Sequence, residues 1–529
     1  MGGGLLKSNK INYLAIIFVN LAVWLPSLFI RFFNDDHQVV LWINPESLAD
    51  VFSPLWEQYI IGFYWRPLPA ILNTSAIFFF GANPFVFHLL SLVIYVIVCI
   101  LLYKLLEKLD LSPETSLVSV LLFSVLPAHE MPVAWLSARN DTIALAFILF
   151  SLIIFIKLRD SSSIKTRGLI TVLMTLAFIS KEASFPLILL FPAYYIIILK
   201  KSLRDVKTFR ELLTGLAVIA IIMLYRHLAM GGPALFSSSN LDSFNIITSA
   251  VNFVAYIPLS FLDAGTLEVI FAAVKDSILV GVLLAIVLIS FGYLLYRGRH
   301  IFKNPIVIFG FAWFLAFSLP VLPLLGRWYA FIPSVGLIIA ASVFYEKSQS
   351  VLLKRVITIT IILASAAFSF NRMADWARVS EKAEEACQAF ADHEYKDIDT
   401  ITLLGAPNKI DGINSMRIGV QETVHYYTGE LLTDVQYPLK TEIYKGCRIY
   451  LDTADGFYRL KASNCRFLAP GSKSSAIPVN EVINFSDDNI EIEIANTKNG
   501  ISTAKFRFRN GSPNKGYIFW FDGIKFRKI

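Results

Sequence analysis

Long apolar runs separated by short polar segments dominate the first 371 residues of the chain. Eleven of these runs are long enough to cross, or nearly cross, a bilayer as a helix. They lie near residues 11–30, 84–106, 114–128, 141–157, 168–180, 183–199, 211–229, 277–296, 304–320, 328–345 and 354–371. The pattern predicts a mainly α, polytopic membrane protein with about eleven transmembrane helices.

Two further apolar stretches, 68–80 and 246–262, are expected not to cross the membrane. Prolines flank the first stretch, and the second lies in a loop after a Gly-Gly-Pro sequence. Both fit re-entrant or interfacial helices on the outer side. The first long run, 11–30, follows two lysines as a signal peptide would, but no small-residue cleavage site follows it, so a retained helix is expected.

Basic residues alternate between the two sets of loops that connect the eleven predicted crossings. One set carries 19 Lys and Arg residues and the other carries 7. Because cytoplasmic loops retain the positive charge, the richer set is predicted to be cytoplasmic. The N-terminus is then cytoplasmic, and everything after residue 370 lies outside.

The composition changes near residue 375, where the apolar runs end. Residues 374–390 are charged and helix-prone, and later segments such as 490–494 and 504–509 alternate apolar and polar side chains, as half-buried strands do. We predict three parts: a transmembrane domain over 1–371, a helical connector over 372–395, and a small extracytoplasmic domain over 396–529 that is α+β or β-rich.

Composition excludes a soluble protein. Of the 529 residues, 56% are hydrophobic and 16% are charged, and the mean hydropathy is +0.60. The net charge of +7 follows the predicted topology, so no nucleic-acid partner is expected. The four cysteines have no metal-binding spacing. Cys447 and Cys465 could pair if their compartment is oxidising, which the sequence leaves open.

Ionisable and aromatic polar residues gather in the poorly charged, outer set of loops. Such groups cost several kcal/mol near hydrocarbon unless they are paired or hydrated, so their positions are the main functional evidence. The set comprises Asp35, Asp36, Arg66, His129, Glu130, Arg139, Asp141, Lys181, Arg327 and Tyr329. We expect these residues to surround one outward-facing mouth near the lipid headgroups.

This collection of charges suits a lipid that bears a phosphate. Arg and Lys neutralise phosphate or diphosphate groups, and a carboxylate accepts a proton from an incoming nucleophile. Fixed cations would stabilise the phosphate that leaves a polyprenyl-phosphate sugar. The sequence therefore predicts a site for a lipid-linked sugar.

Each residue also has a purely structural explanation when it is considered alone. Asp35 and Asp36 could mark a solvated helix end, and His129 with Glu130 could cap a turn. Arg66 and Arg327 could reach toward lipid headgroups. Structural ion pairs are the remaining alternative: Lys181 with Glu182, and Arg139 with Asp141.

Four segments resemble the GT-C class of polytopic glycosyltransferases, and within it the protein O-mannosyltransferase branch, which includes the transmembrane O-mannosyltransferases that carry TPR repeats. They are 33–37 (FNDDH), 65–88 (beginning WRPL), 127–141 (PAHEMPVAWLSARND) and 327–334 (RWYAFIPS). The third resembles the family pattern His-Pro-x-x-x-Glu-x-Val…Gly-Arg-x-Asp, with a different spacing of Pro127 and His129. No TPR array follows here.

The resemblance implies a hexosyltransferase that moves a sugar from a polyprenyl-phosphate donor to a hydroxyl of a protein, a lipid or a glycan. The acidic residue of the first outer loop would be the general base, which here is Asp35 or Asp36. Adjacent side chains of an extended segment face opposite ways, so only one of them should face the donor, and Asp35 is favoured.

In the implied inverting displacement, polyprenyl phosphate would leave toward Arg66, Lys181 and Arg327. The other outer residues, His129, Glu130, Arg139, Asp141 and Tyr329, would bind substrate. The acidic pair with His129 and Glu130 could hold a divalent ion. The resemblance is nevertheless to metal-independent enzymes, so we expect no metal and no cofactor.

Two other functions stay open at this point. A carrier or flippase for lipid-linked glycans would predict charges in the middle of helices and two related halves. An adhesion or envelope-assembly protein would use the outer domain as its working part. The absence of TPR repeats favours a bacterial plasma membrane over the endoplasmic reticulum.

Overall fold

The chain forms two compact units, and each is described by itself. The first comprises residues 1–28 and 45–373, and the second comprises 29–44 and 374–529. The structure, a computed structural model, describes residues 2–41, 45–56, 65–158, 163–202, 206–230, 245–262, 298–324, 326–391, 400–410, 413–415, 423–424, 426–427, 434–454, 457–468, 482–486, 490–496, 501–508, 516–522 and 526–528, with single positions between 263 and 297. The segment 29–44, which the sequence predicts to be outside, therefore belongs to the same unit as the C-terminal residues.

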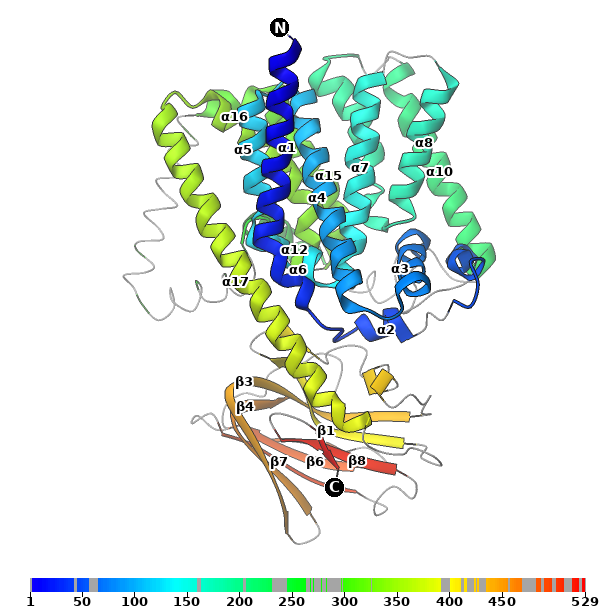
Figure 1. Ribbon diagram of the computed structural model, residues 1–529, viewed down its shortest axis with the longest axis vertical. Helices are drawn as coiled ribbons and strands as arrows, with labels where there is room; N and C mark the ends of the chain where they lie inside the picture. The colour runs from blue at the N-terminus through cyan, green and yellow to red at the C-terminus, as the bar shows by residue number, and fades with distance from the viewer. Residues whose placement is uncertain are drawn as a thin grey trace. The chain divides into compact units, whose positions relative to one another are not determined.

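The first unit is a bundle of apolar helices (Figure 1). Its α-helices are α1 (Gly2–Trp24), α3 (Pro67–Phe80), α4 (Pro84–Lys108), α5 (Pro113–Ser124), α6 (Glu130–Ala134), α7 (Arg139–Leu158), α8 (Ile164–Phe178), α9 (Leu187–Ala193), α10 (Val206–Met230), α12 (Ile246–Leu259), α15 (Pro305–Ser318), α16 (Phe331–Lys347) and the first part of α17 (Val351–Ala391). Short helical turns join them: η2 (Asp50–Leu55), η3 (Pro127–His129), η4 (Leu136–Ala138), η5 (Glu182–Ser184), η6 (Tyr194–Ile198), η7 (Arg299–Lys303), η8 (Leu319–Val321) and η9 (Arg327–Ala330).

Six helices of the described part are long and apolar enough to cross a membrane. They are Lys10–Phe29, Pro84–Lys108, Leu136–Leu158, Phe209–Leu228, Trp328–Lys347 and Val351–Gln388. A seventh span is present if Pro113–Ser124 and Pro127–Ala134, which meet at a bend of 58°, are counted together. The prediction of a mainly α, polytopic membrane protein is confirmed.

Several of the eleven expected runs form short or broken helices instead of single long ones. The runs near 183–199 and 304–320 form the helical segments Glu182–Ile198 and Pro305–Val321, which are shorter than the six long helices. Prolines account for much of this difference, since proline interrupts the backbone hydrogen bonds of a helix interior. Pro192 lies inside α9 directly before the π-helical turn η6. The expected run 277–296 lies outside the described residues, apart from single positions.

The two stretches that were expected not to cross form α3 and α12, each of 14 residues. A span needs about 20 residues, so both helices are too short to cross alone.

Helices α15 and α16 approach closely because each has a glycine at the contact. A Cβ atom added at Gly310 would lie 2.5 Å from the carbonyl oxygen of Gly336, and one added at Gly336 would lie 2.3 Å from that of Gly310. Small residues at such crossings are typical of helices that pack within a membrane.

The second unit contains a mixed nine-stranded sheet in the order β5-β6-β7-β4-β3-β1-β8-β9, with β2 paired to β1. Strand β1 pairs in parallel with β3 and β8, and the other pairs are antiparallel. The strands are β1 (Thr400–Ile410), β2 (Ile413–Asn414), β3 (Asp434–Ala454), β4 (Phe457–Leu468), β5 (Val482–Ser486), β6 (Ile490–Asn496), β7 (Ile501–Phe508), β8 (Gly516–Phe521) and β9 (Phe526–Lys528). The predicted β-rich C-terminal region is confirmed.

A disulfide between Cys447 and Cys465 joins β3 to β4, which answers the pairing that the sequence left open. Cys99 and Cys387 are free and buried.

The C-terminal part of α17 supports the segment 29–37 within this unit. Ser380 Oγ accepts a hydrogen bond of 2.9 Å from the backbone N–H of Arg31, and the rings of Phe33 and Trp376 lie 5.6 Å apart. Further along the helix, the ring of Phe390 packs against Phe526 of β9. The segment that carries Asp35 and Asp36 is thus held by the helix that leads into the sheet.

Candidate active site

A cavity of about 460 Å³ in the first unit brings together three of the residues that the sequence grouped. Arg66, Lys181 and Tyr329 line it, together with Glu182. The rest of its lining is apolar: Ala183, Phe185, Pro186, Ile188 and Leu189 from the chain around α9, and Ala316, Leu319, Pro320, Val321 and Leu324 from α15 and η8. The cavity therefore combines a charged end with apolar walls.

Two ion pairs form the charged end. Arg66 donates from Nε and Nη2 to Oε2 of Glu182 at 3.0 and 2.8 Å. Lys181 Nζ lies 2.5 Å from Oδ2 of Asp141, and these two residues are only 5% and 2% exposed. Lys181 Nζ also lies 5.4 Å from the centre of the Tyr329 ring. Both cations are held in fixed positions before any ligand is bound.

Local sequence explains where these charges stand. Arg66 directly precedes α3, whose first residue is Pro67, and proline suits the first position of a helix. Asp141 lies in the first turn of α7, where a negative charge is favoured by the helix dipole, and Lys181 follows the end of α8, where a positive charge is favoured.

The actual pairing of charges differs from the structural alternatives that the sequence suggested. Lys181 does not pair with Glu182, because the backbone at Lys181 is extended and neighbouring side chains of an extended segment point in opposite directions. Arg139 does not pair with Asp141, since residues two apart on a helix face different ways. Glu182, which the sequence did not place in the site, instead holds Arg66.

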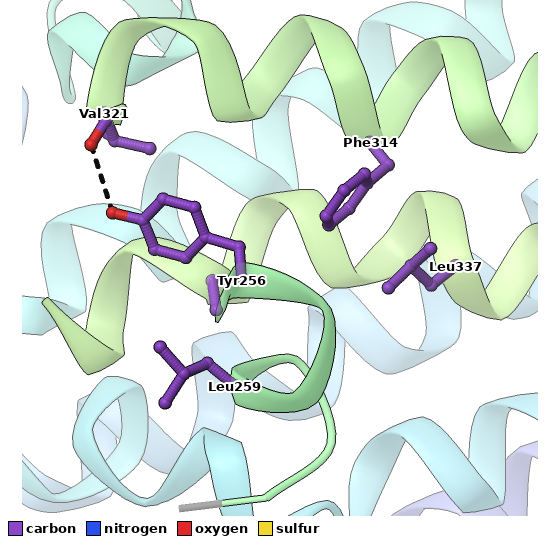
Figure 2. Close-up of a cluster of buried hydrophobic side chains, with 6 residues drawn as sticks. Tyr256, Leu259, Phe314, Val321 and Leu337 are labelled. Atoms are coloured by element: carbon purple, nitrogen blue, oxygen red, sulfur yellow. Dashed lines mark hydrogen bonds between the residues drawn. The ribbon is translucent and has the colours of Figure 1, made fainter. Parts of the chain in front are cut away.

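Helix α12 fixes the apolar wall of the cavity. The Tyr256 hydroxyl donates to the carbonyl of Val321 at 3.1 Å (Figure 2) and also to that of Leu324, while Asn252 Nδ2 donates to the carbonyl of Leu322 at 2.8 Å. The carbonyls of Leu322 and Leu324 lie just after η8 has ended, and that of Val321, the last residue of η8, also accepts from the backbone N–H of Leu324 at 2.9 Å. In an apolar environment such groups need partners, and α12 supplies them.

Apolar packing reinforces the same wall. Tyr256, Leu259, Phe314, Val321, Ala330 and Leu337 form one buried cluster, against which Tyr329 also packs. Figure 2 shows Tyr256 and Leu259 projecting from α12.

Arg139 is buried in the helix bundle and does not line this cavity. It is 1% exposed, donates to the carbonyl of Phe87 at 2.9 Å, and also donates to the side chain of Asn73. These bonds join α7 to α4 and α3. Arg139 thus helps to hold three helices together.

His129 and Glu130 also lie away from the cavity lining. His129 Nδ1 is 2.7 Å from the Tyr95 hydroxyl, and its ring is surrounded by Phe123 and Phe331. Glu130 accepts a hydrogen bond of 2.9 Å from Arg372 in α17. The sequence did not single out Arg372, although a basic residue just after the expected outer end of a span is a recognisable signal.

Arg327 begins η9, the turn that also contains Tyr329. The side chain of Arg327 is outside the described part of the structure. Only the backbone position of this predicted phosphate ligand is therefore established.

Asp35 and Asp36 lie in the second unit and are withdrawn from solvent. Asp35 is 6% exposed and its Oδ1 accepts a 3.0 Å hydrogen bond from Asn34, while Asp36 is fully buried and its Oδ2 accepts from the backbone N–H of Phe33 at 3.4 Å. Asn34 has a φ of 56°, a left-handed conformation that asparagine tolerates better than most residues. The alternative of a solvated helix end is wrong for this pair.

His37 anchors the helix α2 (Asp36–Leu41) that follows the acidic pair. Its Nδ1 lies 3.0 Å from the Thr423 hydroxyl, and its ring contacts those of Tyr426 and Tyr427. Burial lowers the pKa of His37 to about 4, so the imidazole is neutral at physiological pH.

Across the described ranges, no three His, Cys, Asp or Glu side chains are arranged to hold a metal ion.

Residues 67–225 match the family model described as dolichyl-phosphate-mannose-protein mannosyltransferase. This match confirms the predicted resemblance to the O-mannosyltransferase branch, and its range contains Asp141, Lys181 and Glu182. No curated relative matches the chain significantly.

Among solved structures, the chain is similar to an oligosaccharyltransferase from Archaeoglobus fulgidus in complex with zinc and sulfate, with 12% identity, 82% of this chain and 68% of that chain covered, and a TM-score of 0.43. A second structure of that enzyme, tethered to an acceptor peptide with an NVT sequon, is 12% identical and has a TM-score of 0.39. The match covers 80% of this chain and 64% of that chain, so this chain spans slightly less than two thirds of that structure's length. The chain is also similar to ArnT from Cupriavidus metallidurans bound to undecaprenyl phosphate, with 11% identity and a TM-score of 0.43. This match covers 86% of this chain and 97% of that chain.

Proposed function

We propose that this protein is a membrane glycosyltransferase that takes a sugar from a polyprenyl-phosphate donor and transfers it to a hydroxyl acceptor. The cavity carries this proposal, because Arg66 and Lys181 stand at one end of an apolar chamber inside a helix bundle. An isoprenoid phosphate has the complementary form, with an anionic head on an apolar chain. The mannosyltransferase family match over 67–225 supports the same class of substrate.

The cations would act by stabilising the phosphate as it leaves the sugar. Their carboxylate partners, Glu182 and Asp141, hold them in place, so little reorganisation is needed when negative charge develops. Preorganised charges of this kind contribute most in sites from which water is excluded. Arg66 and Lys181 are therefore the proposed leaving-group ligands, with Arg327 as a third.

The acceptor hydroxyl also needs a base, and Asp35 is the proposed one. Asp36 is completely buried and its carboxylate accepts from the backbone of Phe33, which suits a structural role. In a single displacement, the base takes the acceptor proton, the acceptor oxygen attacks the anomeric carbon, and polyprenyl phosphate departs with inversion. The acceptor is proposed only as a protein, lipid or glycan hydroxyl.

The disulfide supports an extracytoplasmic location for the second unit. Disulfides persist in oxidising compartments and are rare in the cytosol. Together with the distribution of basic residues, this favours an N-terminus inside and a C-terminal unit outside. The proposed membrane is a bacterial plasma membrane, because the chain carries no TPR repeats.

The decisive experiment removes one cation together with its partner, so that no buried charge is left unpaired. Arg66→Met/Glu182→Gln is expected to lower transfer from a labelled polyprenyl-phosphate sugar by about 100-fold or more. The matched control is Arg355→Met/Glu114→Gln, an exposed pair of the same chemistry, which should leave transfer unchanged. Normal transfer by the Arg66/Glu182 variant would refute the proposal.

The base is tested separately with Asp35→Asn and Asp36→Asn, using membrane insertion as the control for folding. Loss of a general base costs about 10²–10⁴ in rate. We expect this loss for Asp35→Asn. If both variants retain full transfer, the base lies elsewhere.

A further inference from the structure

A second cavity, of about 470 Å³, lies between the N-terminal parts of α8 and α10. Its polar lining comprises Arg167, Thr171, Arg210, Glu211 and Thr214, and its other lining residues are Ile164, Gly168, Ile170, Val172 and Met174. None of these residues lines the cavity of the candidate active site. The two helices start at the same end of the bundle, so the cavity lies near one membrane surface.

The carboxylate of Glu211 has one oxygen that accepts no hydrogen bond from the described part of the chain. The residue is 6% exposed, and its Oε1 accepts a 2.9 Å hydrogen bond from Nε of Arg210. Its Oε2 is buried and has no hydrogen-bond partner among the residues that the structure describes. A buried carboxylate oxygen without a donor is unfavourable, so a ligand that supplies an N–H group would be stabilised here.

Arg167 supplies a positive charge to the same cavity. Within the described part of the chain, its guanidinium forms no hydrogen bond or ion pair, whereas Arg210 is paired with Glu211. The N-terminal ends of α8 and α10 add partial positive charge at this end of the bundle. An anionic group is therefore favoured beside Arg167.

Glycines shape the space between the two helices. A Cβ atom added at Gly168 would meet nothing within 4 Å, so the cavity is open there. At Gly215 of α10, by contrast, an added Cβ would lie 2.3 Å from Ile188 and 2.7 Å from Met174. Helix α10 thus packs closely against Ile188 of α9 and Met174 of α8 at Gly215, whereas the space beside Gly168 is open.

We propose that this cavity binds a phospholipid whose headgroup carries a primary ammonium, such as phosphatidylethanolamine. The phosphate would bind Arg167, and the ammonium would donate to Oε2 of Glu211. The acyl chains would follow the apolar side chains of Ile170, Val172 and Met174. This lipid site is independent of the proposed transferase chemistry.

The choice of headgroup follows from Glu211. A phosphocholine group has a positive charge but no N–H to donate, and a phosphoglycerol group has hydroxyl donors but no positive charge. A primary ammonium offers both, and charge-assisted hydrogen bonds are the stronger ones.

Lipid binding to the purified, delipidated full-length protein in detergent tests the proposal, with native mass spectrometry as the measurement. We expect phosphatidylethanolamine to bind about tenfold more tightly than phosphatidylcholine or phosphatidylglycerol. Glu211→Gln should remove that preference. Gly168→Leu, which adds an apolar side chain at a position where an added Cβ meets nothing within 4 Å, should weaken binding of all three lipids. The control is Lys165→Ala, an exposed position on α8 that does not line the cavity.

Thermal unfolding verifies that each variant is folded. Equal binding of the three lipids by the wild type, or a preference for phosphatidylglycerol, would overturn the proposal. Unchanged binding by Gly168→Leu would show that lipid binds elsewhere and would also overturn it.

Discussion

Lys181 and Asp141 form an ion pair that is almost completely withdrawn from solvent. Replacing only the lysine, as in Lys181→Met, leaves a buried carboxylate without its cation and should destabilise the protein by about 3–5 kcal/mol. Replacing both, as in Lys181→Met/Asp141→Leu, should restore most of that stability. Thermal unfolding in detergent measures the difference.

The same double variant separates structure from chemistry. If Lys181 binds the leaving phosphate, the restored protein still fails to transfer sugar. Arg355→Met, at an ion pair whose side chains are about half exposed, should change stability by no more than about 1 kcal/mol. Comparable destabilisation by Arg355→Met and Lys181→Met would contradict this account of burial.

His37 makes the second unit sensitive to acid. Its pKa is about 4 in the folded protein and about 6.5 in an unfolded chain, so the unfolded chain binds the proton more readily. The neutral imidazole therefore contributes fully to the free energy of unfolding above pH 6.5. Up to about 3 kcal/mol of that free energy is lost as the pH falls toward 4. The neighbouring groups are the uncharged Thr423, Tyr426 and Tyr427.

The measurement is the unfolding midpoint of the full-length protein at pH 7.5 and pH 5. The wild type should lose more stability between these values than His37→Gln, which carries no titrating group at this position. An identical loss in both proteins would show that other groups control the acid response.

At the scale of elements, α12 holds the wall of the cavity that we propose as the active site. Tyr256→Phe removes the donor to the carbonyls of Val321 and Leu324, which should cost about 1–3 kcal/mol and raise the KM for the donor lipid. Tyr225→Phe is the control, because its hydroxyl also donates to a backbone carbonyl but at an exposed site. Equal effects of the two substitutions on stability and KM would exclude this role of α12.

The helices show which parts of the fold the apolar pattern of the sequence predicts and which parts it does not. Uninterrupted apolar runs predicted α1, α4, α7 and α16 well, because a long apolar segment in a membrane has few alternatives to a helix. The run near 304–320 was predicted less well, because it forms α15 followed by the turn η8 instead of one long helix. Pro320 marks the break at η8, but the partners of the carbonyls at this break, Tyr256 and Asn252, are distant in sequence, and no local pattern identifies them.

The site shows the same limit at the level of side chains. The sequence grouped Arg66, Lys181 and Tyr329, which line one cavity. It also grouped Arg139 and His129, which are engaged with Phe87 and Tyr95 inside the bundle. Charge and loop position predict the side of the membrane on which a residue lies, but the direction of each side chain depends on how the helices pack.

At the scale of the whole molecule, the second unit resumes at Ala374, close to the change in composition near residue 375, but it also includes a segment that composition does not assign to it. Residues 29–44 belong to the C-terminal unit, although they directly follow the first apolar run. Helix α17 continues without a break from Val351 to Ala391, because its apolar and charged parts both favour a helix. The boundary between the units at 373/374, like the boundary predicted near 371, therefore falls inside one helix.

The remaining prediction concerns the direction in which the chain crosses the membrane. Ser202→Cys lies beside Lys200 and Lys201 in a loop predicted to be cytoplasmic, whereas Ser47→Cys lies in the first outer loop. Both positions are exposed, and the natural cysteines are buried or joined in a disulfide. A membrane-impermeant maleimide should label Ser47→Cys in intact bacterial cells and Ser202→Cys only after permeabilisation.

The reverse result would place the acidic loop of Asp35 and Asp36 on the reducing side of the membrane. Because that loop belongs to the same unit as the disulfide, the unit would then have to keep Cys447 and Cys465 oxidised in the cytosol, where disulfides are rare. The labelling pattern and the redox state of the two cysteines must therefore agree, and each tests the other.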